Sequence, residues 1–363
     1  MNVACGIVGL PNVGKSTIFN ALTAAQAEQG NYPFCTIEPN VAVVEVPDPN
    51  LQTIHGFIKT DRVLPAICQV TDIAGLIAGA ATGEGMGNKF LANIRECDAI
   101  MHVVRCFGGT TVLRESDVDP IGDIEVIELE LILADLETVE KAAQRHQKRA
   151  RSGNKDELAA VEILTRAAAV LESGKLMRHA EWSTREMAVL TPLCLMTAKS
   201  MLYVANVADD DIDGTSELAQ RVARHAEASG AAWIPFCGDI ESELRQMDDN
   251  ERREFMADFG IEQLGLDALI SAVYKLLGLR TYYTAGEIEI RAWTVKQGDL
   301  APQAAGVIHT DFEKNFIRAE VYSVSDLVEF ESEAAIRAAG KLRTEGRDYA
   351  LQDGDICHFL IGK

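Results

Sequence analysis

Residues 4–17 read Ala-Cys-Gly-Ile-Val-Gly-Leu-Pro-Asn-Val-Gly-Lys-Ser-Thr, an apolar run that leads into a glycine-containing turn. Residues 9–16 of this stretch fit the pattern G-x-x-x-x-G-K-[ST]. The apolar residues 3–9 predict a short buried strand before the turn, and residues 15–27 predict a helix after it. Strand, glycine loop and helix in this succession are typical of a loop that binds a chain of phosphates.

The residue types in the loop suit the chemistry of a nucleotide's phosphate chain. Glycines allow the backbone to wrap the phosphates with its N–H groups, and the N-terminus of the following helix adds a favourable dipole. Lys15 is expected to reach the β- and γ-phosphates, and the Ser16 hydroxyl is expected to be a ligand of Mg²⁺. The nucleotide-binding residues predicted here are Asn12, Val13, Gly14, Lys15, Ser16 and Thr17.

A second phosphate-side motif, Asp72-Ile-Ala-Gly75, ends an apolar run at residues 66–72. Asp72 is expected to hold Mg²⁺ through water, and the Gly75 N–H to meet the γ-phosphate. The glycine-rich residues 83–87 favour a mobile switch here over an isolated aspartate at a strand end. Thr36 is the candidate for a second hydroxyl ligand of Mg²⁺. Lys15, Asp72 and Gly75 are therefore the predicted catalytic residues.

Strand and helix patterns alternate along most of the chain. Near-continuous apolar runs suit parallel strands that are covered on both faces, and segments with helical spacing lie between them. We expect a doubly wound α/β nucleotide-binding domain formed by residues 1–125 and 192–278. Its predicted strands after the first lie at 66–72, 99–106, 201–206 and 232–236, and its later helices at 88–97, 216–229 and 264–277.

Two further regions have a different pattern of apolar residues. Residues 126–191 contain no strand-like run, and a break at 152–154 separates two apolar stripes, which predicts an inserted helical hairpin of coiled-coil type. Residues 279–363 predict a small separate domain of mixed type. The stripes are Ile127, Leu131, Ala134, Leu136 and Val139, then Leu158, Val161, Leu164, Ala168 and Leu171; the strand-like pieces of the last domain are 288–295, 306–310, 316–321 and 356–361.

Composition limits the class of protein. The 363 residues are 47% hydrophobic, and no apolar run approaches the roughly 18–20 residues that span a membrane. Eight cysteines lie singly, with no CxxC pair, which argues against a zinc site and a disulfide framework and for a reducing compartment. With an N-terminus unlike a signal peptide, these features predict a cytoplasmic protein without a membrane partner.

Charge is unevenly distributed. The net charge of −21 disfavours indiscriminate nucleic-acid binding, but it permits a local basic face. Residues 141–155, at the expected tip of the hairpin, carry six Lys or Arg and no acid. The run is either a solvated face or a contact for a phosphate backbone. The candidate contacts are Lys141, Arg145, Lys148, Arg149, Arg151 and Lys155.

The element that would read the base is Asn206-Val207-Ala208-Asp209, after the predicted strand 201–206. GTPases usually place N-K-x-D here, where the Asp accepts from guanine and the Lys stem packs on the ring. Val207 stands in the lysine's place, which weakens a preference for guanine. Asp209 could still accept from a guanine, so the residues alone leave adenine and guanine open.

Taken together, the motifs resemble the YchF family of Obg-like ATPases. The resemblance implies a TRAFAC-class P-loop NTPase domain, a coiled-coil insert and a C-terminal TGS domain of β-grasp type. It also implies a preference for ATP, with Asn206 and Val207 in contact with the adenine. It further implies that the protein binds the ribosome and that the bound nucleotide controls this association. The family usually has Glu where Asp209 stands. The matching stretches are 6–17, 32–40, 72–76, 83–90, 102–107, 301–306 and 309–314.

One departure from the family concerns the attacking water. Leu76 follows D-x-x-G, where Ras-like enzymes have a Gln that orients water. Members of the family are thought to use a histidine from the loop that here spans residues 108–114, which has none. Arg114 is either a solvated loop arginine or a group that stabilises γ-phosphate charge. It cannot act as a base, so slow turnover is expected.

We therefore expect a monomeric, Mg²⁺-dependent ATPase that hydrolyses ATP slowly and binds the ribosome through the basic tip and the TGS domain. Two alternatives stay open. One is a GTPase switch that reads guanine through Asp209. The other is a non-catalytic, ATP-gated RNA or ribosome adaptor.

Overall fold

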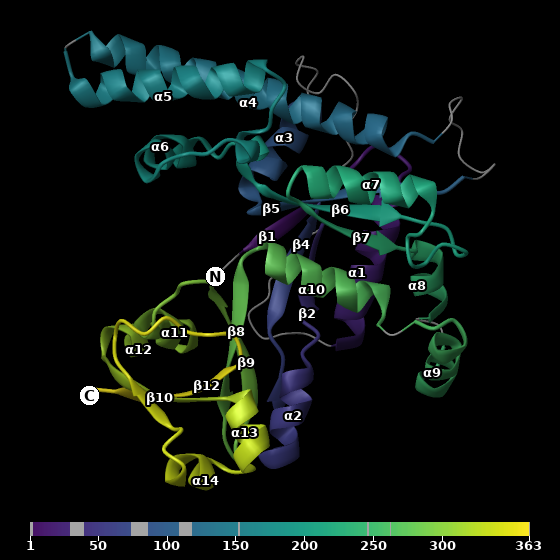
Figure 1. Cartoon of the computed structure of the whole chain (residues 1–363), viewed down its shortest axis with the longest axis vertical. Helices are drawn as coiled ribbons and strands as arrows, with labels where there is room; N and C mark the ends of the chain where they lie inside the picture. Colours follow the sequence, from purple (N-terminus) through teal and green to yellow (C-terminus); the bar gives the residue numbers. More distant parts are fainter. Residues whose placement is uncertain are drawn as a thin grey trace. The chain divides into compact units, whose positions relative to one another are not determined.

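The structure, a computed structural model, describes residues 3–29, 40–73, 86–108, 118–151, 153–244, 247–261 and 263–362. Contacts divide the chain into two compact units (Figure 1). The larger comprises Val3–Ala42 and Gln69–Leu269, and the smaller combines Val43–Cys68 with Ile270–Lys363. Among the helices of the described ranges, none combines the length and the hydropathy that a membrane span needs.

A six-stranded sheet forms the core of the larger unit. The pairings of β1 with β4 and β5, of β5 with β6, and of β6 with β7 are parallel. Every residue of β5 is buried, as expected for a strand covered on both faces, and this burial explains its continuous apolar run. The order is β2 (Val41–Glu45), β4 (Ile67–Asp72), β1 (Ala4–Val8), β5 (Ala99–Arg105), β6 (Ser200–Asn206) and β7 (Ala232–Phe236).

The sheet confirms the predicted α/β class and places the first loop. The chain runs from β1 to β4 on one side and then crosses to β5 on the other, so the strand order reverses at β1. Ligands of open α/β sheets bind at the carboxyl ends of the strands at such a point. The helices of this unit outside the insert are α1 (Lys15–Gln29), α3 (Met86–Glu96), α7 (Glu217–Ala228), α8 (Gly238–Leu244), α9 (Asp249–Asp258) and α10 (Gly265–Leu276), whose last turns enter the smaller unit.

The insert contains two long helices, α4 (Pro120–Ala150) and α5 (Lys155–Glu172). Pro120 occupies the first turn of α4, where its missing N–H costs nothing, and Asn154 caps α5 by accepting from the Asp156 N–H. The predicted break at 152–154 lies between the two helices. The chain returns through η2 (Met177–His179), α6 (Thr184–Leu190), η3 (Thr191–Leu193) and η4 (Met196–Ala198).

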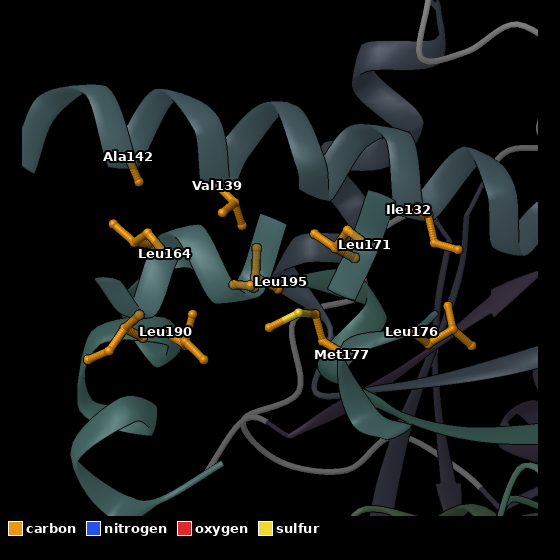
Figure 2. Packing of buried hydrophobic residues seen from close by; sticks show 11 residues of the cluster. Ile132, Val139, Ala142, Leu164, Leu171, Leu176, Met177, Leu190 and Leu195 are labelled. Atoms are coloured by element: carbon orange, nitrogen blue, oxygen red, sulfur yellow. The ribbon is translucent and has the colours of Figure 1, made fainter. Parts of the chain in front are cut away.

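An apolar cluster holds the insert together. Figure 2 shows Val139 and Ala142 of α4 pointing toward Leu164 of α5. The predicted stripe on α5 is partly wrong, because Leu158 is 49% exposed. The buried face of α5 combines two alanines with three large apolar residues, and the prediction missed the alanines because it followed the large residues alone. The buried residues of α5 are Ala160, Ile163, Leu164, Ala167 and Leu171.

The smaller unit is built on a second six-stranded sheet. Its order is β11 (Arg343–Glu345), β10 (Phe316–Ser323), β12 (Asp355–Ile361), β8 (Leu279–Ala285), β9 (Ile290–Lys296) and β3 (Val63–Leu64). Its helices are α2 (Pro49–Phe57), α11 (Ala301–Ile308), α12 (Thr310–Lys314), α13 (Val324–Phe330) and α14 (Glu333–Ala338).

The predicted strand at 306–310 is wrong. These residues end α11 and begin α12. Pro302 in the first turn and a Gln303 side chain that accepts from the Leu300 N–H start α11, so helix signals upstream outweigh a short apolar run.

Residues 43–68 group with the C-terminal segment, although the sequence boundaries put them in the nucleotide-binding domain. The Tyr283 hydroxyl donates to Asp48 Oδ2 at 2.7 Å and accepts from Asn50 Nδ2 at 3.1 Å. The strand β3 also pairs with β9. This segment, which runs in the sequence from within β2 to the start of β4, thus contributes to the smaller unit.

Candidate nucleotide-binding site

The loop between β1 and α1 has an unusual backbone. Gly9, Asn12 and Gly14 have positive φ angles of 156°, 62° and 100°. Such angles are readily adopted by glycine and, less often, by asparagine. The loop residues therefore suit a turn that brings successive N–H groups to one side, ahead of the helix N-terminus at Lys15.

Two glycines are also required by close packing of the loop on the neighbouring strands. A Cβ at Gly14 would lie 2.1 Å from Asn206 Nδ2, and a Cβ at Gly9 would lie 2.5 Å from the Val103 carbonyl oxygen. Both distances are far below contact distance, so no larger residue fits without a shift. The loop is thus held against β5 and β6.

Lys15 lies inside this loop with only 8% of its surface exposed. Its Nζ donates to the carbonyl oxygens of Gly9 at 2.9 Å and Leu10 at 2.7 Å. Burial lowers the pKa of Lys15, and the charge of Asp72 opposes that shift. Burial likewise raises the pKa of Asp72, and Lys15 opposes it. The two predicted catalytic side chains therefore interact across one site.

The donors that Mg²⁺ would need lie at the same edge of the sheet. Ser16 is exposed in the first turn of α1, and Asp72 ends β4, which pairs with β1. A hydroxyl and a carboxylate are hard oxygen donors of the kind that Mg²⁺ prefers, so these residues fit the ion. The exposed Thr17 follows Ser16. Of the other predicted residues, Thr36, Gly75 and Arg114 lie outside the described residues.

On the base side, Asn206 has a role that the sequence did not reveal. Its side chain is 5% exposed, and Nδ2 donates to the Val13 carbonyl at 2.9 Å. This bond ties the end of β6 to the phosphate-binding loop. Val207 is 3% exposed, and its N–H donates to the Phe236 carbonyl at 3.0 Å, whereas Asp209 is exposed. The close fit of Gly14 against Asn206 explains why a small residue stands there.

His102 is a core residue, as expected from its place within a strand. It is 1% exposed on β5, and burial lowers its pKa to about 3, so the ring is neutral at pH 7. Its ring packs against Tyr203 at 5.6 Å between centroids. His102 therefore carries no charge toward the phosphate site.

The six basic residues of the hairpin are exposed and gather at one end of it. They belong to the last turns of α4, the connection and the first residue of α5, at the far end of the hairpin from the sheet (Figure 1). Lys141 forms an ion pair with Glu137, and His146 Nδ1 lies 2.6 Å from Glu157 Oε2. The structure thus brings together Lys141, Arg145, Lys148, Arg149, Arg151 and Lys155.

A buried polar cluster, which sequence reasoning missed, joins the base of the hairpin to the sheet. Glu128 of α4 accepts from the Tyr203 hydroxyl of β6 at 2.6 Å and from Arg178 of η2 at 3.2 Å. Arg178 also donates to the Tyr203 hydroxyl at 3.2 Å, and His225 of α7 lies 3.9 Å from Glu128. Burial alone would raise the pKa of Glu128, but these partners lower it to about 2.

Comparisons with known proteins agree with this architecture. A family model named YchF-GTPase_C, described as a protein of unknown function, matches residues 279–362. Another, described as a 50S ribosome-binding GTPase, matches residues 4–152.

Individual relatives match along the whole chain. The ribosome-binding ATPase YchF of Pasteurella multocida is 51% identical over 360 residues, 99% of each chain. The protein of the same name from Bacillus subtilis is 49% identical over 362 residues, again 99% of each. The solved structure of the Schizosaccharomyces pombe YchF GTPase is 38% identical, with a TM-score of 0.90 over 99% of this chain and 98% of that one. Similarity of this extent, in sequence and in fold, shows that the chain belongs to the YchF family.

Proposed function

We propose that the chain is a Mg²⁺-dependent ATPase that hydrolyses ATP slowly and binds the ribosome under the control of its nucleotide. The observation that carries the ATPase proposal is the phosphate-binding loop, in which the buried Lys15 donates to two loop carbonyls and interacts with the half-buried Asp72 at the end of β4. The relatives named ribosome-binding ATPase support both halves of the proposal.

Each residue of the loop has a defined task in this proposal. Lys15 Nζ exchanges two carbonyl partners for the β- and γ-phosphates, whose negative charge makes them stronger acceptors. Asn206 keeps the loop in register with β6 through Val13. Ser16, Thr36 and Asp72 would hold Mg²⁺, which when bound neutralises charge on the phosphates.

The choice of base is argued from the residues, because the names of relatives differ. Some are called ATPases, whereas the Schizosaccharomyces pombe structure is called a GTPase. We favour adenine because Val207 stands where guanine readers have a lysine. Because Asn206 Nδ2 donates to the Val13 carbonyl of the loop, we assign the other amide atom, Oδ1, to contact with the base. Recognition of guanine through Asp209, which is exposed, is the alternative.

Slow turnover is proposed from the sequence. Leu76 has no group that can orient water, and residues 108–114 supply no histidine. Arg114 would act only on γ-phosphate charge. The main contribution to hydrolysis is then the positioning and charge stabilisation supplied by Lys15, Asp72, the Gly75 N–H and Mg²⁺.

Single-turnover release of γ-phosphate tests the proposal. The protein in excess over labelled ATP or GTP, with Mg²⁺, should hydrolyse ATP in preference to GTP, and EDTA should stop the reaction. No release from ATP, despite tight binding, would support the non-catalytic adaptor instead. Preferential release from GTP would support the GTPase alternative.

The ribosome proposal rests on the exposed basic tip, with the C-terminal unit, proposed to be a TGS domain of β-grasp type, as a second contact. We place the protein in the cytoplasm as a monomer. Cosedimentation with purified ribosomes should be stronger with a non-hydrolysable ATP analogue than with ADP, or the reverse. Equal sedimentation in both states would remove the nucleotide from the control of binding.

A further inference from the structure

The helix α4 has two apolar faces, and only one of them is buried. Ile124, Ile127 and Leu131 are fully buried in the larger unit. Residues 126, 129 and 133 form a second row with helical spacing, in which Val126 is 39%, Leu129 54% and Leu133 43% exposed. We call this row the α4 stripe.

Packing among the described residues of the larger unit does not account for the α4 stripe. A helix that packs on one side needs a single apolar face, and its opposite face is ordinarily polar. Isolated exposed apolar residues are common, but three large ones in line on one helix form a continuous surface of the kind found at interaction sites. The stripe also lies on the sheet-side half of α4, away from the basic tip.

The charge around the stripe indicates what it binds. Between Pro120 and Glu140, α4 carries seven Asp or Glu and no Lys or Arg, but Glu128 pairs with Arg178, Glu137 pairs with Lys141, and Asp135 is buried. Glu125 and Glu140 are exposed on the helix surface on either side of the stripe. Carboxylates around an apolar centre favour a partner with an apolar centre and a positively charged border. They disfavour nucleic acid, whose phosphates they repel, and symmetric pairing with a second copy of the same stripe.

We propose that the α4 stripe binds a basic amphipathic segment of another protein, and that on the ribosome this segment belongs to a basic ribosomal protein. The inference rests on the proposed ribosome binding and divides it between two surfaces. The basic tip contacts RNA, and the stripe contacts protein. An amphipathic helix would place residues at positions i, i+3 and i+7 against Val126, Leu129 and Leu133.

Photocrosslinking on purified ribosomes identifies the partner of the stripe. Leu129 is replaced by p-benzoylphenylalanine in the full chain, and Phe259, 57% exposed and outside the hairpin, is replaced in the same way as the matched control. The adduct from position 129 should survive ribonuclease and disappear with protease treatment of its partner, and it should exceed the adduct from position 259. An adduct to RNA, an adduct to a second copy of the chain, or no excess over position 259 would overturn the proposal.

Affinity measurements give an independent test. The double variant Leu129→Ser/Leu133→Ser should bind ribosomes roughly five-fold or more weakly, since apolar anchors dominate such interfaces, with unchanged ATP affinity and melting temperature. Phe259→Ser, at an exposed apolar position outside the hairpin, should have no effect. If the parent chain binds ribosomes and the double variant binds equally well, the stripe proposal fails alone. If the parent chain does not bind ribosomes, both proposals fail.

Discussion

The loop between β1 and α1 and the hairpin of α4 and α5 are built in contrasting ways. In the loop, single residues are fixed by one or two specific contacts: Gly14 packs against Asn206, and Lys15 donates to two carbonyl oxygens. In the hairpin, an apolar cluster spread over several turns holds the helices together, and six exposed basic residues lie at the tip.

This contrast indicates where substitutions should have large effects. A loop whose residues each make specific contacts should lose its activity through one substitution. A surface of repeated charges should lose binding gradually, because long-range electrostatic attraction to phosphates is shared among all of them. The buried cluster at Glu128 lies between the two regions and should behave like the loop.

The largest effect is expected at Lys15. Lys15→Ala removes the cation that stabilises charge on the β- and γ-phosphates, so single-turnover hydrolysis of ATP should fall by about 10²–10³-fold. The far-ultraviolet circular dichroism spectrum should be unchanged, because the variant removes a buried charge rather than packing. A variant that hydrolyses ATP at the parent rate would mean that the activity arises elsewhere.

The next effect is on stability. Glu128→Gln removes the charge that pairs with the buried Arg178, and the free energy of unfolding at pH 7 should fall by about 3 kcal/mol, the value of a pKa lowered from 4.5 to about 2. Urea unfolding measures it. Glu125→Gln, at an exposed position of the same helix, is the matched control and should change little.

The pH dependence of that difference has a defined sign. The folded pKa of Glu128 is below its unfolded value, so its contribution is fully present above about pH 4.5 and is lost as the pH falls toward 2. The stability gap between parent and variant should therefore shrink over this window. A gap that stays constant from pH 7 to pH 2 would show that the carboxylate charge is not its source.

A smaller effect is expected at Asn206. Asn206→Ala leaves the buried Val13 carbonyl without its donor, and nucleotide affinity should fall by roughly ten-fold. If Asn206 only positions the loop, ATP and GTP affinities fall by the same factor. If its amide oxygen contacts adenine, the affinity for ATP falls further. Unchanged affinity for both nucleotides would contradict both roles.

The smallest single effects are expected at the tip. Lys148→Ala should weaken ribosome binding only two- to three-fold, whereas Lys148→Glu/Arg149→Glu/Arg151→Glu should abolish most of it and lower its salt dependence. The triple reversal Lys175→Glu/Arg185→Glu/Lys275→Glu, at exposed basic positions elsewhere, is the matched control for net charge. Equal losses in the two triple variants would remove the tip from the account.

The sequence predicts the loop and the central strands well, for physical reasons. The loop pattern is rigid because each position has its own steric or chemical requirement, and β5 and β6 are almost entirely buried strands with nearly continuous apolar sequence. Both signals are local, so a single sequence contains them.

Long-range contacts are what the sequence could not supply. The cluster of Glu128, Arg178 and Tyr203 joins residues 75 positions apart, and each looks like an ordinary polar residue in its own segment. The Asn206–Val13 bond spans 193 positions. The grouping of residues 43–68 with the C-terminal segment depends on Tyr283 in the same way.

Equilibrium binding of non-hydrolysable ATP and GTP analogues, with Mg²⁺, distinguishes an adenine site from a guanine site. We expect the ATP analogue to bind more than about ten-fold tighter, a difference of about 1.4 kcal/mol, because Val207 replaces the lysine of guanine readers. Equal or tighter binding of the GTP analogue would contradict it, and would assign guanine recognition to Asp209.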